Sequence, residues 1–306
     1  MAWYRGDCHV HSVHSDGELT PAELVAEARA AGLDFLATTD HNTAAAHFAW
    51  PGDFLVITGE EVTTPTGHWL ALGIPPGHEV DWRYRVRDGV IGDRLAEVHG
   101  FGGLCVAAHP HAPYRSGDFM FPFDGFDAVE VWNGRWTSDL PWNADNESAL
   151  AAWGHTLAAD LHQGPWRPAM GNSDTHQPGQ IGIPQTVVWA DELSTPAILA
   201  AIRAGRGWVA ESRAVELALS VTAGDRTAGI GEELPTGGAS AVVRLHVSGV
   251  AAGTVTFHTD QGKAHHAPLA TDLEWQTTAA DSSFVRVEVR HEDGRMAALT
   301  NPVILT

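Results

Sequence analysis

Two histidines near the start of the chain, His9 and His11, are spaced like metal ligands on a β-strand. Residues 4–12 alternate in character, which predicts a strand, and side chains two positions apart on a strand project from the same face. A carboxylate, Asp16, follows in the next turn. Imidazole and carboxylate groups together suit a divalent transition metal. On its own, however, the His-x-His pair is also compatible with an incidental pair of strand residues.

Further ligand-type residues stand where other strand-like runs end. They are Asp40 and His41 after residues 34–39, Glu60 and Glu61 after residues 53–58, His109 after residues 104–108, and Asp174 and His176 after residues 167–173. Helices are expected between these strands. Ligand-type residues at successive strand ends are typical of the C-terminal mouth of a parallel barrel, so we expect these side chains to converge.

Taken in order, these motifs resemble the PHP (polymerase and histidinol phosphatase) metallohydrolases. The motifs are HVHSVHSDG at 9–17, TDHNT at 39–43, GEE at 59–61, GH at 67–68, AHP at 108–110, EVWN at 130–133 and SDTH at 173–176. Within the family they look most like the CehA/McbA-like hydrolases. The resemblance covers residues 4–212, and a looser similarity continues to residues 298–302, which resemble that branch's closing strand.

The resemblance implies a site for two or three divalent metal ions, namely Zn, Mn or Fe. The first ion would be held by His9, His11, Glu61 and Asp174, the second by Glu61, His68 and His109, and the third by Asp16, His41 and His176. Glu61 is favoured because the family pattern is Gly-x-Glu, although sequence parity leaves Glu60 open. Asp16 stands where many relatives have a histidine, and this harder oxygen ligand shifts the third position toward manganese or iron, or toward partial occupancy.

The predicted reaction is hydrolysis by a metal-bridging hydroxide, since paired metals lower the pKa of a shared water. The favoured substrate is a small-molecule phosphate ester. Cleavage of a carbamate, ester or amide is the alternative, and a metal-binding module without turnover is a second alternative. Asp174 and His176 are candidates for moving a proton, although both are better placed as ligands, and Asp40 is a candidate to orient an imidazole.

Three residues are candidates for binding the substrate. Arg115 and Arg135 offer guanidinium groups to an anion, and Asn133 belongs to the EVWN motif. Both arginines lie in a segment between His109 and Glu147 that is rich in aromatic residues. Such a loop at a barrel mouth either contacts the substrate or packs its rings onto the barrel wall. If it contacts the substrate, we expect an apolar or aromatic moiety to bind there, against side chains such as Phe121 and Trp136.

The chain has 306 residues, of which 44% are hydrophobic, enough for one barrel and a smaller domain. We predict an α/β fold in which residues 1–212 form a distorted TIM-like (β/α)7 barrel of the PHP type. After residue 212 the helical period disappears, and short β-type runs separated by Gly and Asp turns predict a small antiparallel β-sandwich over residues 213–306. Histidines 258, 265, 266 and 291 share no ligand spacing and are expected to be solvated.

The formal net charge of −20 repels phosphate backbones, so nucleic acid is not expected as a partner. No run approaches the roughly 20 apolar residues of a membrane span. The N-terminus has no apolar signal region, so no membrane partner and a cytoplasmic location are expected. Cys8 and Cys105 stand inside predicted strands and are expected to be buried, reduced thiols. The oligomeric state stays open.

Overall fold

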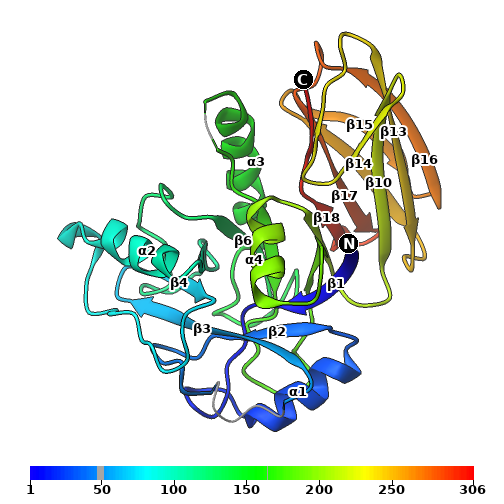
Figure 1. Cartoon of the computed structure of the whole chain (residues 1–306). Coiled ribbons are helices and arrows are strands. Elements are labelled where there is room, and N and C mark those ends of the chain that lie inside the picture. Colours follow the sequence, from blue (N-terminus) through cyan, green and yellow to red (C-terminus); the bar gives the residue numbers. More distant parts are fainter. Residues whose placement is uncertain (47–51, 164) are drawn as a thin grey trace.

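The computed structural model describes residues 1–46, 52–163 and 165–306. Within these residues the chain is a mixed α/β protein, in which fifteen strands join one large sheet and four more form a second sheet (Figure 1). The helices belong to the first two thirds of the chain, and the last third is built from strands. This distribution agrees with the predicted change in character near residue 213.

The first seven strands lie side by side in chain order. They are β1 Ala2–Asp7, β2 Phe35–Thr38, β3 Leu55–Thr64, β4 Gly67–Leu72, β5 Leu104–Ala107, β6 Ala128–Asn133 and β7 Ala169–Asn172. β4 runs antiparallel to both neighbours, and the other adjacent pairs are parallel. The two ends of the series meet, because Val10 bridges Thr175 in parallel and the N–H of His11 donates to the carbonyl of Thr175 at 2.9 Å.

β1 ends earlier than the alternation in the sequence predicts. It stops at Asp7, and the following residues have their backbone hydrogen bonds elsewhere: the N–H of Val10 donates to Thr39 Oγ1 at 2.8 Å. His9 and His11 therefore lie on an extended segment just beyond the strand. Both side chains are fully buried.

In the described part of the chain four α-helices pack on the sheet. They are α1 Pro21–Ala30 on β2, α2 Ile91–Gly100 on β5, α3 Asn146–Gln163 on β6, and α4 Thr195–Arg203 on β3 and on β8 Gln185–Ala190; a short 3₁₀ helix, η2 Val86–Asp88, precedes α2. α1 begins with a capping box, in which the Thr20 hydroxyl oxygen accepts from the N–H of Glu23 and the Glu23 carboxylate accepts from the N–H of Thr20. None of the described helices is both long and apolar enough to cross a membrane.

The large sheet continues from the first part of the chain into the last. β8 Gln185–Ala190 pairs antiparallel with β1, β9 Gly207–Ala210 with β8, and β18 Met296–Thr300 with β9. The other C-terminal strands are β10 Glu216–Ala223, β11 Arg226–Gly229, β12 Glu233–Leu234, β13 Ser240–Ser248, β14 Gly253–Thr259, β15 Gly262–Pro268, β16 Asp272–Thr278, β17 Phe284–His291 and β19 Val303–Leu305. A continuous ladder thus crosses the predicted boundary at 212/213, and the division into two domains stays a prediction.

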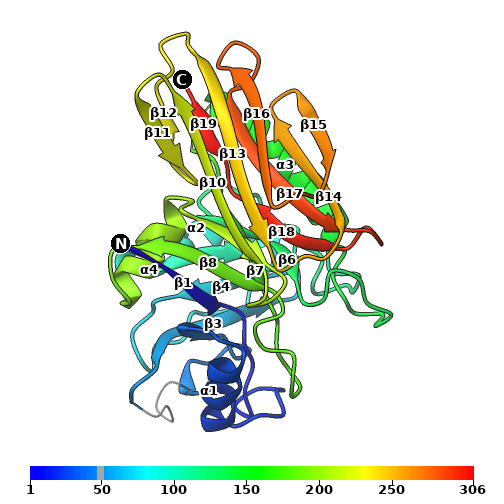
Figure 2. The same cartoon turned by 90° about the vertical axis from the view of Figure 1, so that its right-hand side faces the viewer.

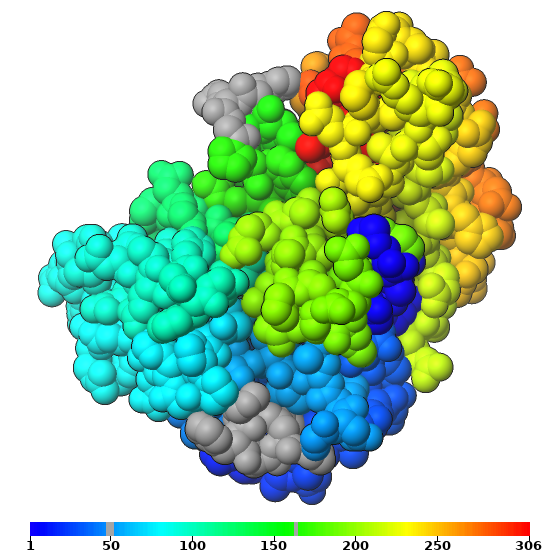
Figure 3. Space-filling model, in the orientation of Figure 1, coloured from blue at the N-terminus to red at the C-terminus, as the bar shows by residue number. Residues whose placement is uncertain are grey.

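The C-terminal strands pack face to face. β11, β10, β13 and β16 form the second sheet, and their apolar residues, such as Leu219 and Val243, share one core cluster with Val255 and Val287 of the larger sheet (Figure 2). In the space-filling view these strands form an upper lobe (Figure 3). Arg5 of β1 ties this lobe to the rest of the molecule, since its guanidinium lies 3.0 Å from Glu216.

One expectation about this part of the chain is wrong. His258 is 8% exposed rather than solvated, and its Nε2 lies 3.0 Å from Glu288 Oε1. The reason is that β14, which carries His258, is paired on both sides, with β15 and β17, and so lies inside the sheet. The two cysteines, by contrast, are buried free thiols as predicted.

Candidate metal centre

The side chains of the nine predicted ligands converge at one end of strands β1–β7. Groups of their ligand atoms lie within 4.8 Å of one another. The groups are His9 with His11 and Glu61; His9 with His109 and Asp174; Glu61 with His68 and His109; and His11 with Asp16, His41 and His176. Residues as far apart in the sequence as His9 and His176 thus share one cluster, as their positions at strand ends predict.

Glu61 lies at the centre of the cluster. Its Oε1 is 3.0 Å from both His68 Nδ1 and His109 Nε2, and its Oε2 is 2.7 Å from His41 Nδ1. The neighbouring Glu60 points to the other side of β3, where its carboxylate accepts from the N–H of Val80 at 3.0 Å. Of the two glutamates that the sequence left open, Glu61 is the one whose carboxylate contacts the imidazoles.

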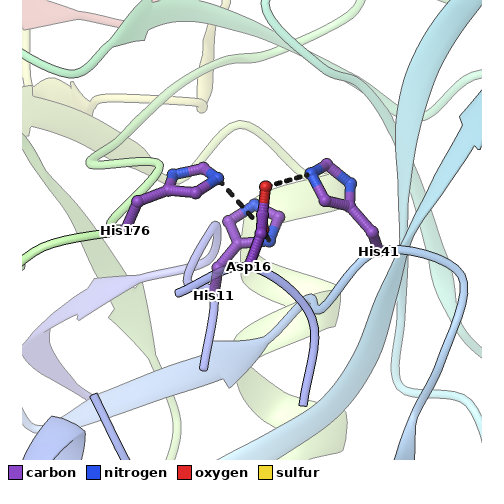
Figure 4. A group of neighbouring side chains, drawn as sticks. All are labelled: His11, Asp16, His41 and His176. Atoms are coloured by element: carbon purple, nitrogen blue, oxygen red, sulfur yellow. Dashed lines mark ion pairs between the residues drawn. The ribbon is translucent and has the colours of Figure 1, made fainter. Parts of the chain in front are cut away.

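Two aspartates complete the cluster on opposite sides. Asp174 Oδ1 lies 3.1 Å from His11 Nε2 and 3.3 Å from His9 Nε2. Asp16, which is more than half exposed, lies between two imidazoles, with its oxygens 3.3 Å from His176 Nε2 and 3.5 Å from His41 Nε2 (Figure 4). His11 is close both to this group and to His9 and Glu61, so it lies between the first and the third of the predicted ligand sets.

The cluster contains buried polar atoms that no hydrogen bond satisfies. Among the described residues His68 Nε2 and His109 Nδ1 have no polar partner at all. His9 Nε2, His11 Nε2, Glu61 Oε2 and Asp174 Oδ1 have only one another and His41 Nδ1, together with Glu61 Oε1, 2.7–3.5 Å away, without the geometry of a hydrogen bond. A buried polar atom without a partner costs roughly 1–3 kcal/mol. Six such atoms in one place, all nitrogen or carboxylate oxygen, are the donor set that Zn, Mn or Fe prefers. The residues present therefore fit a group of divalent cations.

The charges of the cluster are strongly coupled. Burial raises the pKa of the Glu61 and Asp174 carboxyls, but the surrounding imidazoles outweigh it and hold both pKa values well below their usual range. Burial also lowers the pKa of His41 and His176. Glu61 and Asp16 outweigh it at His41 and raise its pKa to about 10, and Asp16 and Asp174 raise the pKa of His176 to about 9. The carboxylates are therefore ionised and ready to bind cations, while these two imidazoles hold protons that a cation must displace.

Glu130 of the EVWN motif, for which no role is predicted from the sequence, contacts the cluster from the side away from the cavity. Its fully buried carboxylate lies 3.1 Å from His9 Nδ1 and accepts from the N–H of His109 at 2.8 Å and from the Asn172 amide at 3.0 Å. A carboxylate on the second nitrogen of a ligand histidine fixes its tautomer and orientation. The signal that predicts such a role is a charged residue inside the apolar run 128–132, since a buried charge must be paired.

Asn133 and Asp40, two predicted functional residues, also lie beneath the cluster. The Asn133 amide donates to Glu130 at 3.0 Å and to Asp174 at 3.3 Å. Asp40 accepts from Ser12 and from the Ser15 hydroxyl, both within 2.8 Å, and the Ser15 oxygen lies 3.4 Å from His11 Nδ1. Among the described residues no imidazole contacts Asp40 directly, so any orienting effect on a histidine runs through Ser15.

The backbone is strained beside the cluster. His109 and Asp174 have φ values of +25° and +52°, and Asn42, next to His41, has +54°. They are the non-glycine residues with positive φ in the described part of the chain. Such conformations cost about 1–3 kcal/mol each and persist at functional sites where surrounding contacts impose them.

A cavity of about 640 Å³ opens above the cluster. Its outer wall includes Tyr114, Arg135, Leu140 and Trp142. Trp142 is 61% exposed and Leu140 is 45% exposed. Of the two arginines predicted to bind the substrate, Arg135 lines the cavity, whereas Arg115 is exposed and is not among the lining residues.

The expected contacts of Phe121 and Trp136 with a substrate are wrong. Both side chains are buried, and neither is among the lining residues of the cavity. Phe121 packs with Trp69 and Phe126, and Trp136 packs with Trp132 and Leu150. For these two rings the alternative of packing against the wall holds. Apart from the histidines, the apolar and aromatic residues that line the cavity are Tyr114, Leu140, Trp142 and Ile183.

Comparison with known proteins gives the fold a wider setting. No family model matches the chain. An uncharacterized protein of Methanocaldococcus jannaschii is 26% identical over 151 residues, which are 42% of this chain and 81% of that protein. The structure of a lesion-specific endonuclease of Pyrococcus furiosus aligns with a TM-score of 0.42 and 16% identity, over 67% of this chain and 56% of that one. The expectation that nucleic acid is not a partner is not confirmed.

A two-domain protein of Bacteroides vulgatus, reported to contain a predicted PHP-like metal-dependent phosphoesterase, is similar over nearly the whole length. The alignment covers 99% of this chain and 95% of that one, with a TM-score of 0.55 and 17% identity. It therefore includes the C-terminal strands as well as the strands that carry the cluster. The chain shares the overall fold of this PHP-like protein.

Proposed function

We propose that the chain is a metal-dependent hydrolase of the PHP type, in which the clustered imidazoles and carboxylates hold two or three divalent ions. The observation that carries the proposal is the set of buried nitrogen and oxygen atoms without satisfied hydrogen bonds, on residues that lie on or just beyond strands β1, β3, β4, β5 and β7 and converge in one cluster. The order of the motifs and the shared fold support it. On this reading residues 1–212 are a distorted TIM-like barrel and residues 213–306 a β-sandwich.

The proposed ligand sets are those that the resemblance implies. His9, His11, Glu61 and Asp174 hold one ion, Glu61, His68 and His109 a second, and Asp16, His41 and His176 a third. Glu61 is suited to bridge, because its two oxygens face different imidazoles. Bound divalent ions supply a Lewis acid and a water of lowered pKa.

The proposed substrate is a small-molecule phosphate ester. A cavity of about 640 Å³ has the size of sites that hold small ligands. Arg135 is the arginine among its lining residues and would bind an anionic oxygen. The Tyr114 ring lies beside His68 and His109, and burial raises the pKa of its phenol, so the hydroxyl stays protonated and can donate to a substrate oxygen.

The remaining roles follow from position. Asn133 holds Asp174 in place and faces the cavity, while His176 and Asp174 border it and can accept or return a proton. Leu140 and Trp142 offer an apolar surface at the mouth to the leaving group. An aryl phosphate satisfies all of these features at once.

The test is hydrolysis by protein loaded with Mn²⁺, Zn²⁺ or Fe²⁺, assayed against aryl phosphates and, in parallel, against aryl carbamates and esters. Phosphate release that disappears in His9→Ala supports the proposal. Carbamate turnover without phosphate release would replace the phosphoesterase by the alternative. Equal inactivity of the loaded protein and His9→Ala on the whole panel would favour a metal-binding module without turnover.

A further inference from the structure

One wall of the cavity is a connecting segment, residues 134–145 between β6 and α3. It provides Arg135, Leu140 and Trp142 to the cavity lining. At its base, the Asn146 side chain holds both ends together, since its amide donates to the carbonyls of Asn133 and Trp136 at 3.1 and 3.3 Å. The cavity-facing part of the segment is mostly exposed, so its position depends on a few anchors.

Trp136 is the main side-chain anchor of this segment. Its indole is 6% exposed and packs edge-to-face on Trp132, with ring centroids 5.1 Å apart. The indole N–H donates to Glu147 Oε1, at the start of α3, at 2.9 Å. The side chain next to Arg135 is thus fixed by one apolar contact and one hydrogen bond to a carboxylate.

The same carboxylate is held by a residue from the C-terminal strands. Both terminal nitrogens of Arg290, on β17, donate to Glu147, one to each oxygen, and the second bond is 3.0 Å long. The guanidinium carbon lies 5.3 Å from the centroid of the Trp136 ring. Paired two-point contacts and a cation over an aromatic face are among the stronger interactions of an arginine. Trp136, Glu147 and Arg290 therefore form one connected unit.

Other residues of β17 and β18 also pack against α3 and against the buried base of the segment 134–145. The Arg286 guanidinium lies 5.1 Å from the Trp153 ring of α3. Phe284 and Leu299 share a core cluster with Trp132 and Trp136. Figure 2 shows β17 and β18 crossing beside α3 and β6. The C-terminal strands thus extend the core that carries the cavity-forming segment.

We propose that the C-terminal strands brace the substrate wall, and that Arg290 is a positioning residue that sets the affinity for substrate through Glu147 and Trp136. The inference rests on the proposed function for its kinetic consequence, but not for its structural one. Arg290 touches neither the cavity nor the cluster. Its loss therefore loosens residues 134–145 while leaving the metal ligands in place.

The experiment compares Arg290→Met with a matched control, Arg244→Met, which removes the exposed pair of Arg244 with Glu274 on strands of the same lobe. In Arg290→Met we expect faster amide hydrogen exchange in residues 134–145, unchanged metal content, and a KM for 4-nitrophenyl phosphate raised about fivefold with kcat within about twofold of the parent. Arg244→Met should match the parent in all four measurements. Arg290→Lys, which retains the cation but not the two-point contact, should fall between.

Trp136→Phe provides a second route if Arg290→Met does not fold, because it removes the hydrogen bond to Glu147 and part of the buried ring while it keeps an aromatic side chain at this position. Unchanged exchange in residues 134–145 in the folded variants would overturn the brace. Faster exchange with unchanged KM would overturn the role of Arg290 in substrate affinity. Faster exchange in a protein whose parent hydrolyses nothing on the panel would keep the brace and remove the proposed function, so the two failures are distinguishable.

Discussion

Ligand-type residues gather at both ends of strands β5 and β6, but the two groups differ in whether their polar atoms have partners. Before these strands, Asp127 accepts from His99 Nε2 and from the N–H of Cys105, both at 2.8 Å, and from Arg203 at 3.0 Å. Beyond them, His109 Nδ1 is buried and lacks a partner among the described residues.

Proximity alone therefore does not distinguish a metal site. His99, Cys105 and Asp127 are as close together as the groups of the candidate centre. Their atoms are already committed, however: the guanidinium of Arg203 lies beside the carboxylate and the Cys105 thiol contacts the carbonyl of Leu95. The polar atoms of His99 and Asp127 are used in contacts within the fold, whereas the candidate centre retains buried nitrogen and oxygen atoms without hydrogen bonds. Barrel enzymes show the same division between the two ends of their strands.

The largest effect is expected from Glu61→Gln. It removes the charge that faces the imidazoles and leaves an amide that cannot bridge two cations, so metal content should fall by at least one ion per chain. Activity should fall by at least about 100-fold. Elemental analysis and phosphate release provide the two measurements. Glu60→Gln, one residue away on the other face of β3, is the control and should keep its metal. Full metal content in Glu61→Gln would contradict the assignment.

The next effect concerns pH. His41 and His176, with pKa values of about 10 and about 9, hold protons in the metal-free protein at neutral pH. Cation binding must displace them, so affinity should rise with pH, by about tenfold per unit for each proton released, and weaken in acid. Calorimetry of Mn²⁺ binding between pH 6 and 8, in buffers of different ionisation enthalpy, counts these protons. An affinity independent of pH, with no proton release, would show that the imidazoles are not ligands.

A smaller effect is expected from Glu130→Gln, which keeps the size of the side chain but removes the charge opposite His9. Because such partners orient a ligand imidazole, metal affinity should fall about 10–100-fold. A chelator competition against the parent protein measures it, and the thermal midpoint shows whether the variant is folded. Unchanged affinity in a folded variant would reduce Glu130 to a packing role.

The sequence shows the cluster more clearly than the cavity above it, for a physical reason. Histidines of the cluster such as His9 and His109 follow buried strands, and the ends of neighbouring parallel strands must lie together, so the local sequence pattern is enough to predict their convergence. The local pattern does not predict whether an aromatic side chain in a loop points into the core or into the cavity. Phe121 and Trp136 are buried while Trp142 is exposed, and these outcomes depend on contacts with distant strands such as β17. His258 was misjudged for the same reason, since its burial comes from two neighbouring strands.

The smallest effect on metal binding and activity is expected from a change at Asp127, at the end of β5 and β6 opposite the candidate centre. It tests the difference between the two ends of these strands directly. Asp127→Ala leaves the N–H of Cys105 and the side chain of Arg203 without their acceptor, which should cost about 1–3 kcal/mol of the free energy of unfolding. Metal content and activity should stay those of the parent, because no atom of this group faces the cavity. Chemical denaturation and elemental analysis of the same preparation measure both quantities. Loss of metal from folded Asp127→Ala would mean that unpartnered donor atoms are not what separates the two ends of the strands.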